Sequence, residues 1–198
     1  MKTTLIALIV AAGLASVSGQ GTVNFANTPF GDGIDRSVYW CNGANLEKLT
    51  GTNYVAALYF GVSPASLNSF AVRSLGDQSL ASAVGHFRDI DQTNPLAGTW
   101  VGGLRYFPGI EVGQVVELQV RIWDFSLFAT YAEAIAQGGF TVRSDVFSYV
   151  ATTPDDSLRM WNLRAFAPLT CVPEPSIPVI AGVGLAGICL VHSLRKQS

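Results

Sequence analysis

Histidine is the side chain that most often acts as a general base near neutral pH, and residues 20–171 contain one, His86. A nucleophilic mechanism would require His86 to meet a serine and a carboxylate. The chain has neither a Gly-x-Ser-x-Gly nor a His-Glu-x-x-His motif. With one histidine, a multi-histidine metal site is excluded from this stretch. We therefore interpret His86 as a strand or surface residue and expect no catalytic residue.

Paired carboxylates are a second group that could do chemistry, because glycoside hydrolysis uses two of them across a cleft. The candidate pairs are Asp32 with Asp35, Asp89 with Asp91, and Asp155 with Asp156. Spacing along the chain does not fix their separation in space, and aspartate is favoured in turns. Asp89 and Asp91, with Asn94 nearby, could also offer oxygen ligands to calcium, but the glycine and terminal glutamate of an EF-hand loop are missing. We expect turns here, and no metal, cofactor or enzyme; a glycoside hydrolase is the less favoured alternative.

Aromatic side chains offer a third kind of chemistry, the stacking of a ring against a sugar. The chain has 4 tryptophans, and Trp123 falls on the polar parity of an alternating segment. If that parity faces solvent, Trp123 can contact a glycan while nearby polar side chains bind the hydroxyl groups. The alternative is a tryptophan that packs in the core or covers the sheet.

The elements that would position these residues are mostly strands. In residues 116–123 one apolar set alternates with a more polar one: Val116, Leu118, Val120 and Ile122 against Glu117, Gln119, Arg121 and Trp123. This period of two predicts a strand with one buried face, preceded by turns at Pro108-Gly109 and Gly113. Residues 54–60 are apolar on both parities, which predicts a central strand covered on both sides.

Shorter patterns predict the remaining elements. Strands are expected in residues 22–26, 83–87, 99–106, 140–150 and 161–165, with Phe140, Val142, Val146 and Val150 sharing one face. Residues 130–137 are rich in alanine and precede Gly138-Gly139, which predicts one short helix. Short strands, frequent turns and one small helix favour an all-β fold, an antiparallel β-sandwich or jelly-roll-like domain.

The C-terminal segment breaks this pattern and predicts a single transmembrane helix. Residues 177–194 form an apolar run of 18 residues without Asp, Glu, Lys or Arg, close to the roughly 20 residues that cross a bilayer. The run lacks the polar stripe of a surface helix, although a buried C-terminal helix is the alternative. Arg195 and Lys196 follow it and favour a cytoplasmic C-terminus.

The N-terminal segment predicts export of what lies between the two ends. Lys2, the apolar run in residues 5–15 and the small residues up to Gly19 have the layout of a signal peptide; an uncleaved anchor is the alternative. We expect three parts: a signal peptide in residues 1–19, one exported domain in residues 20–171, and an anchor in residues 172–198. Of the 14 acidic residues only Glu174 lies outside the domain, against three of the 12 basic ones, so its net charge is about −4. This charge does not favour nucleic acid.

The cysteines fit an exported domain. Cys41 and Cys171 both fall in residues 20–171, where a disulfide between them would persist outside the cytoplasm. Two free thiols are the alternative. Cys189 lies in the apolar run and is interpreted as a small apolar residue.

The C-terminal residues carry a resemblance to a known sorting signal. Val172, Pro173, Glu174 and Pro175, the apolar run, and the Arg195-Lys196 tail together resemble the PEP-CTERM signal of bacterial exported proteins. The resemblance implies a transient anchor in the cytoplasmic membrane and recognition by exosortase, an integral membrane protease. It also implies cleavage near Pro173-Glu174-Pro175, with release or transfer to the cell surface.

A second resemblance is scattered over the domain. Residues 21–27, 118–124, 129–134, 138–139 and 144–147 are similar to uncharacterised PEP-CTERM surface proteins of the Verrucomicrobia type, which implies location and β architecture only. The sequence therefore predicts an exported structural or adhesive protein of the cell surface or extracellular matrix, with extracellular polysaccharide as a candidate partner. The alternative function is a carbohydrate-binding module that uses exposed aromatic residues such as Trp123.

Overall fold

The structure is a computed structural model that describes residues 19–156 and 159–166. Residues 1–18 of the predicted signal peptide, and the sorting motif, apolar run and basic tail of the C-terminus, lie outside the described residues, as do Cys171 and Cys189. Within the described part the chain is mostly β, with antiparallel strand pairs and few helices, as predicted. Among the described helices none has the length and apolar character needed to span a bilayer.

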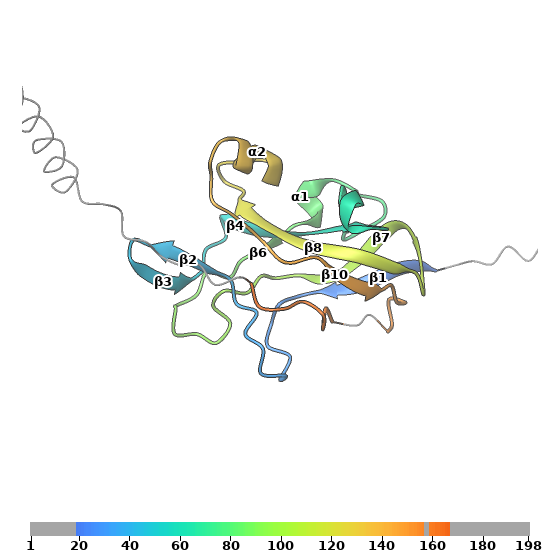
Figure 1. Cartoon of the computed structure of the whole chain (residues 1–198), viewed down its shortest axis with the longest axis horizontal. Coiled ribbons are helices and arrows are strands. Elements are labelled where there is room, and N and C mark those ends of the chain that lie inside the picture. Colours follow the sequence, from blue (N-terminus) through green and yellow to red (C-terminus); the bar gives the residue numbers. More distant parts are fainter. Residues whose placement is uncertain (1–18, 157–158, 167–198) are drawn as a thin grey trace, which may run out of the picture.

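The strands are β1 (Gln20–Phe25), β2 (Tyr39–Asn42), β3 (Asn45–Lys48), β4 (Tyr54–Gly61), β5 (Ser69–Phe70), β6 (Gly85–His86), β7 (Gly103–Glu111), β8 (Val115–Asp124), β9 (Thr141–Arg143) and β10 (Phe147–Val150). The helices are α1 (Leu80–Ala83), α2 (Tyr131–Ala136) and the 3-10 helix η1 (Pro64–Ser66). The largest sheet has the order β10-β8-β4-β5, with β6 beside β4 and β9 beside β8. β1 pairs with β7, and β2 with β3 (Figure 1).

Two isolated bridges join the β1–β7 pair to the large sheet. Thr22 N donates to Thr152 O at 2.8 Å, just after β10, and Val72 N donates to Tyr106 O at 2.9 Å, just after β5. Each bridge is reciprocated by a second backbone hydrogen bond. The strands thus follow one another in a closed order, which leaves fewer unpaired backbone groups at the edges of the two sheets.

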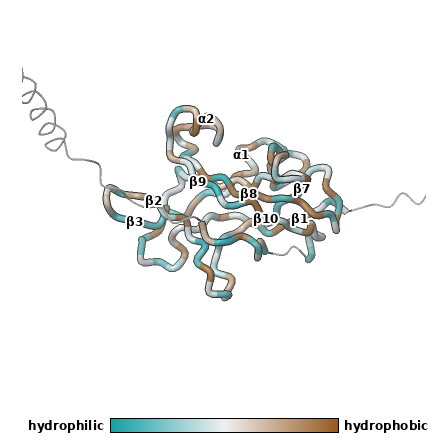
Figure 2. Tube along the Cα trace, viewed as in Figure 1, coloured by the Kyte–Doolittle hydropathy of each residue, from teal (hydrophilic) through white to brown (hydrophobic). Residues whose placement is uncertain are grey.

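The inner face of the large sheet packs on β1 and β7. Val116, Leu118, Val120 and Ile122 of β8 are fully buried there, which confirms the predicted alternation. They belong to one cluster with Phe25 of β1 and Phe107 of β7, among others. β8 carries both hydrophobic and hydrophilic colours along its length (Figure 2). Strand β4 is central and buried over most of its length, also as predicted.

The outer face of β4 and β8 is partly covered by the two short α-helices (Figure 1). Helix α2 begins after Thr130, whose Oγ accepts a hydrogen bond from Glu133 N at 3.1 Å. It is followed by Gly138 with φ +69°, a conformation that glycine adopts at little cost. The predicted helix is confirmed. Together with α1 it buries a second cluster that includes Trp123 and Tyr131.

A buried arginine of β7, Arg105, connects this strand to α1 by a hydrogen bond. Arg105 is fully buried, and its Nε donates to Ala83 O, the last residue of α1, at 3.0 Å. Its Nη1 donates to two further carbonyls, those of Gly102 and Leu104. Burial lowers the pKa of Arg105 to about 10, and the charge of Arg73 acts in the same direction. Carbonyl dipoles thus replace the water that this guanidinium loses.

Several predicted boundaries are wrong for local reasons. Pro108-Gly109 lies inside β7, because the register with β1 shifts between Gln20 and Thr22 and the extra residues of β7 bulge out. The Gln20 side chain donates to the carbonyls of Phe107 and Ile110 within this bulge. The turn before β8 is made by residues 112–113, as the Gly113 signal predicted.

Two further segments do not form the predicted strands. Part of residues 83–87 closes α1 before the short β6, because Ser79 caps the helix N-terminus through a hydrogen bond from Ser82 N. Residues 161–165 turn instead of extending: Leu163 N donates to Met160 O at 2.9 Å. This turn buries Met160 and Leu163 and leaves Trp161 half exposed.

Candidate functional site

The connection from β9 to β10 contains one residue more than the stretch of β8 beside it. Arg143 lies opposite Arg121, whereas Phe147 lies opposite Leu118, so three connecting residues face two residues of β8. Ser144 bridges the gap: its N donates to the carbonyl of Val120 at 2.9 Å and its Oγ accepts from the N of the same residue at 3.0 Å. This is a β-bulge, a feature that re-aims side chains.

The bulge overturns the predicted parity of this region. The sequence pattern put Val146 and Val150 on one face with Phe140 and Val142, but the side chains buried in β10 are Phe147 and Tyr149. Val146 and Val150 are exposed. One inserted residue moves every following side chain to the other face of a strand, and the alternation of residue types alone did not reveal the insertion.

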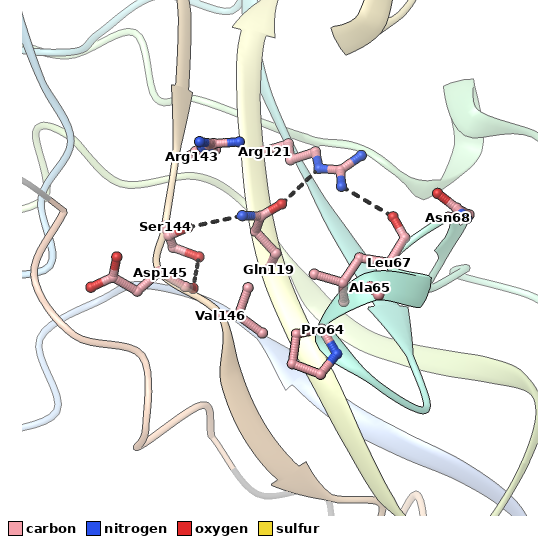
Figure 3. A pocket seen from close by; sticks show the side chains of 10 residues that line it. All are labelled: Pro64, Ala65, Leu67, Asn68, Gln119, Arg121, Arg143, Ser144, Asp145 and Val146. Atoms are coloured by element: carbon pink, nitrogen blue, oxygen red, sulfur yellow. Dashed lines mark hydrogen bonds between the residues drawn. The ribbon is translucent and has the colours of Figure 1, made fainter.

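The bulge forms one wall of a pocket of about 440 Å³, and the η1 segment after β4 forms the other (Figure 3). This volume lies in the range of about 300–1,000 Å³ that is typical of small-molecule sites. The polar lining residues are Asn68, Gln119, Arg121, Arg143, Ser144 and Asp145. The remaining lining residues are Pro64, Ala65, Leu67 and Val146. The pocket is thus polar on the β8–β9 side and has apolar groups on its flanks.

Arg121 is held in a fixed orientation on the floor of this pocket. Its Nε donates to Gln119 Oε1 at 2.9 Å, and its Nη2 donates to Leu67 O at 3.1 Å. The guanidinium carbon lies 4.1 Å from the ring centre of Tyr59 and 5.6 Å from that of Tyr131, distances at which a cation is attracted to the ring face. Stacking and hydrogen bonds together restrict the Arg121 side chain before any ligand arrives.

Gln119 connects Arg121 to the bulge. Its Oε1 accepts from Arg121, and its Nε2 donates to the carbonyl of Ser144 at 3.2 Å (Figure 3). The Gln119 residue is buried, so both hydrogen bonds replace water that it cannot reach. The side-chain amide of Gln119 therefore connects the bulge to Arg121 through two hydrogen bonds.

Arg143 is the second cation of the pocket and is exposed. It lies directly opposite Arg121 on the neighbouring strand. Within residues 19–156 and 159–166, the ion pair found is that of Arg36 with Asp32, so no described carboxylate neutralises Arg121 or Arg143 at contact distance. Burial raises the pKa of Tyr131, and the charges of Arg143 and Arg121 partly oppose this rise, as expected for two cations near one hydroxyl group.

Trp123, the predicted glycan contact, does not reach the surface. It lies on the outer face of β8 as the parity required, but α2 covers it and its exposed fraction is 0%. Its Nε1 donates to Phe128 O at 2.9 Å, which satisfies its only polar atom. The prediction that Trp123 contacts a ligand is therefore wrong, and the alternative of a sheet-covering tryptophan holds.

Trp161 is the tryptophan that presents a ring to solvent, with an exposed fraction of 50%. Its ring centre lies 5.0 Å from that of Phe30. Arg159 lies close by, with its guanidinium carbon 5.5 Å from the Phe30 ring centre. This small aromatic and basic surface adjoins a shallow pocket that also includes Tyr149, Val150 and Asn162.

His86 lies in the short strand β6 and is exposed. Its Nδ1 is 2.9 Å from Thr52 O, and its ring makes an edge contact with Phe125. Neither neighbour is a nucleophile or a carboxylate, so the structure places His86 where a strand or surface histidine is expected.

Asp32 and Asp35 have separate hydrogen-bonding roles. Asp32 accepts two hydrogen bonds from Arg36, at 2.9 and 2.6 Å; these bonds hold its pKa at about 2. Burial acts to raise the pKa of Asp35, but hydrogen bonds from Ser37 and Tyr39 lower it on balance. Burial, and next the hydrogen bond that Tyr39 donates to Asp35, raise the pKa of Tyr39 to about 12. Neither carboxyl group has the raised pKa that a general acid needs.

Arg36 is the other partner in this cluster and is buried. Besides Asp32 it donates to the carbonyl oxygens of Leu163 at 2.6 Å, Trp161 at 3.3 Å and Ile34 at 3.4 Å. Its guanidinium carbon lies 4.4 Å from the Phe30 ring centre. We call Arg36, Asp32, Phe30 and these carbonyls the Arg36 clamp. It ties residues 30–36 to residues 161–163, far away in the sequence.

Among the remaining acidic candidates, Asp91 lies beside a turn and Asp156 lies in one. Asp91 O accepts from Asn94 N at 2.9 Å, and Asn94 Oδ1 accepts from Leu96 N at 2.9 Å, the local pattern of an Asx-turn. Asp156 accepts from the Thr153 hydroxyl group. Among the residues the structure describes, no three His, Cys, Asp or Glu side chains are grouped so as to hold a metal ion.

Cys41, in strand β2, is disulfide-bonded. The other two cysteines of the chain, Cys171 and Cys189, are outside the described residues, so the pairing with Cys171 stays a prediction. Val172, Pro173, Glu174 and Pro175, and the basic Arg195 and Lys196, are outside them as well.

The alternation in residues 116–123 put Arg121 on the polar face of a strand but did not reveal the pocket. The signal was present only in part, since Gln119 and Arg121 share that face. The pairing with Arg143 depends on β9, which follows a helix and a turn, and the bulge depends on backbone geometry.

A comparison with protein-family models, curated proteins and solved structures finds no significant match to this chain.

Proposed function

We propose that this protein is an exported structural or adhesive component of the cell surface or extracellular matrix. The observation that carries the proposal is the disulfide of Cys41, because protein disulfides persist in exported compartments and are rare in the cytosol. A disulfide from Cys41 to Cys171 would also tie the start of the C-terminal segment to the β2–β3 hairpin.

The two ends of the chain support the same location. The apolar runs in residues 5–15 and 177–194 fit a signal peptide and a membrane anchor. The resemblance of Val172-Pro173-Glu174-Pro175 to a PEP-CTERM signal suggests that an exosortase-type protease cuts the anchor. The domain in residues 20–171 would then be the part of the protein that is exported.

The finer architecture that we propose is an antiparallel β-sandwich. A single buried cluster between the large sheet and the β1–β7 pair supports it, and the bridges at Thr22 and Val72 draw the two layers together at their edges. A sandwich with its strands closed in this way suits a surface component, since unpaired strand edges promote aggregation.

A structural or adhesive role is favoured over glycoside hydrolysis by the Asp32–Asp35 pair. Arg36 holds one carboxyl group ionised, and Ser37 and Tyr39 hold the other. An inverting or retaining hydrolase needs one carboxyl group that is protonated at its working pH. Both groups here serve the folding of the loop that contains them.

The experiment is to fractionate cells that express the full chain and to measure the intact mass of the protein in each fraction. We expect a mature N-terminus at Gln20, a disulfide-bonded Cys41, and an extracellular form that lacks residues 176–198. Glu174→Ala should accumulate in the membrane with those residues attached, whereas Glu47→Ala, which removes a glutamate from the β2–β3 hairpin, should be processed normally. If every fraction retains residues 176–198, cleavage is refuted; a reduced cytoplasmic protein would refute export.

A carbohydrate-binding module is the second candidate, and the half-exposed Trp161 beside Phe30 favours it. Exposed rings on a rigid scaffold can stack against sugars. If this surface binds neutral glycans, Trp161→Ala should abolish retention on a glycan array, while Leu127→Ala, which shortens a more exposed apolar side chain, should not. An array on which the unaltered protein binds no glycan would eliminate this candidate.

A further inference from the structure

We infer that the pocket between the β9–β10 bulge and η1 binds an oxyanion, a carboxylate or a sulfate ester, carried by an extracellular polysaccharide. The polysaccharide part of this inference rests on the proposed surface location. The oxyanion part rests on Arg121, Arg143 and their surroundings. It also identifies what an adhesive domain of this kind would adhere to.

The pocket brings together two positive charges. Arg121 and Arg143 are cross-strand partners, and like charges in such positions destabilise a sheet. The two arginines lack a described carboxylate at ion-pair distance. A bound oxyanion would remove this repulsion and would replace it with two charge-assisted interactions.

The Arg121 side chain is preorganised for binding. Its Nε and Nη2 are already used by Gln119 and Leu67, and its plane is stacked near Tyr59. Burial raises the pKa of Tyr59, whereas the charge of Arg121 and a side-chain hydrogen bond with it act in the opposite direction, so the Tyr59 hydroxyl group also helps to fix the guanidinium. Because the side chain is fixed beforehand, binding loses little conformational entropy.

Asp145 is the acidic residue of the lining, and the direction of its side chain favours an anionic ligand. Figure 3 shows its carboxylate pointing away from Arg121, on the far side of the bulge. The inserted residue therefore turns this negative charge outward, while the buried Ser144 side chain accepts a hydrogen bond from Val120 N and donates one to Asp145 O. A bulge that re-aims a charge in this way is a recurrent feature of binding sites.

The pocket also offers groups that suit the rest of a sugar residue. The Asn68 side chain is exposed at the mouth of the pocket and can bind hydroxyl groups. Pro64 and Val146 offer apolar surface to the C–H groups of a pyranose ring. Arg143 and Asn68 are both exposed, so the site opens to solvent, as the passage of a polymer requires.

The overall charge of the chain makes this inference specific. The formal net charge is −2, so the protein as a whole repels a polyanion. Binding to one must therefore depend on a local cationic site, and removal of a single arginine from that site should be visible.

The experiment measures binding of the full chain to polygalacturonate, dextran sulfate and neutral dextran. We expect binding to at least one acidic polymer and none to neutral dextran. Arg143→Gln should weaken binding about tenfold, the loss of one charge-assisted contact. Arg143→Lys should recover part of it, since it keeps the charge but not the planar fork. Arg164→Gln, the same charge change at an exposed arginine outside the pocket, should bind like the unaltered protein.

The polymers also identify the source of the oxyanion. Binding to polygalacturonate alone assigns a carboxylate, and binding to dextran sulfate alone assigns a sulfate ester. Failure to bind either polymer, equal binding to neutral dextran, or equal losses in Arg143→Gln and Arg164→Gln would overturn the inference. A protein that is exported and processed but fails these tests would leave the proposed function intact, so the two failures are distinguishable.

Discussion

Two arginines of this domain, Arg36 and Arg121, both stack on an aromatic ring, but the charged residues beside them have opposite signs. Arg36 lies over the ring of Phe30 and Arg121 over that of Tyr59, at 4.4 and 4.1 Å. Arg36 meets the carboxylate of Asp32, whereas Arg121 meets a second arginine, Arg143. Stacking on a ring thus orients the guanidinium in both settings, whereas the sign of the neighbouring charge decides whether its positive charge is neutralised within the fold.

Arg36 joins two distant loops of the fold, whereas Arg121 lines a pocket that is open to a ligand. The Arg36 clamp joins two loops whose residues lie 127 positions apart, and its five hydrogen bonds all have acceptors within the chain. Arg121 also holds local structure together through Gln119 and Leu67, but it adds positive charge to a solvent-filled pocket. We expect the first arginine to matter for stability and the second for binding.

The largest expected effect is that of Arg36→Met. It should lower the free energy of unfolding by about 3 kcal/mol, because a buried guanidinium is removed and three backbone carbonyls lose a charged donor. Equilibrium urea unfolding of the full chain measures it, with exposed Arg164→Met as the control, for which a change of less than about 0.5 kcal/mol is expected. Similar losses for the two variants would show that the clamp is not a special contact.

A smaller loss is expected for Arg121→Met, about 1–2 kcal/mol in the same assay. The methionine keeps the packing of the alkyl chain, but the cation–π contact with Tyr59 and the hydrogen bonds to Gln119 and Leu67 are lost. A loss as large as that of Arg36→Met would remove the distinction between clamp and site.

Asp32→Asn should destabilise the protein less than either arginine truncation, because Arg36 keeps its carbonyl acceptors. Arg36 lowers the pKa of Asp32 from 3.8 to about 2 in the folded state. The folded state therefore binds this proton more weakly than the unfolded state. The contribution of Asp32 is fully present above about pH 4 and is lost as the pH falls towards about 2. Urea midpoints of the two proteins should converge over this range; a constant difference would contradict the assignment.

The smallest effect on stability is expected for Arg143→Gln. Removing one of two facing cations should leave the free energy of unfolding unchanged or raise it by about 0.2–1 kcal/mol, and added salt should remove the gain. A clear destabilisation at low salt would mean that Arg143 has a structural partner, and the pocket would then resemble the Arg36 clamp.

Local patterns predicted the elements in which one face packs against a single neighbour. The alternation in residues 116–123 identified β8 and its inner face, since four apolar residues in this spacing have one way to be buried together. Thr130 and Gly138 bracketed α2 because a cap and a left-handed glycine act within a few residues. These signals act within the segment itself, so contacts with distant segments did not change the elements that they predict.

The predictions that failed concerned contacts between distant segments. Trp123 was assigned to the correct face of β8, but α2 covers that end of the face and leaves the Arg121 end open. The alternation around Val146 hid a bulge whose cause is the pairing of Ser144 with Val120. The pocket depends both on the uncovered Arg121 end of this face and on the bulge. The sequence therefore did not reveal it.

By itself the sequence determined the mostly β character, the inner face of β8 and the short helix α2, because side-chain periodicity and capping are local properties of the chain. The tertiary structure alone decided that Arg121 faces Arg143, that Asp145 points outward and that Arg36 finds Asp32 together with the carbonyls of residues 161 and 163. Strand register and loop closure bring these groups together, and both depend on which distant segments pack side by side.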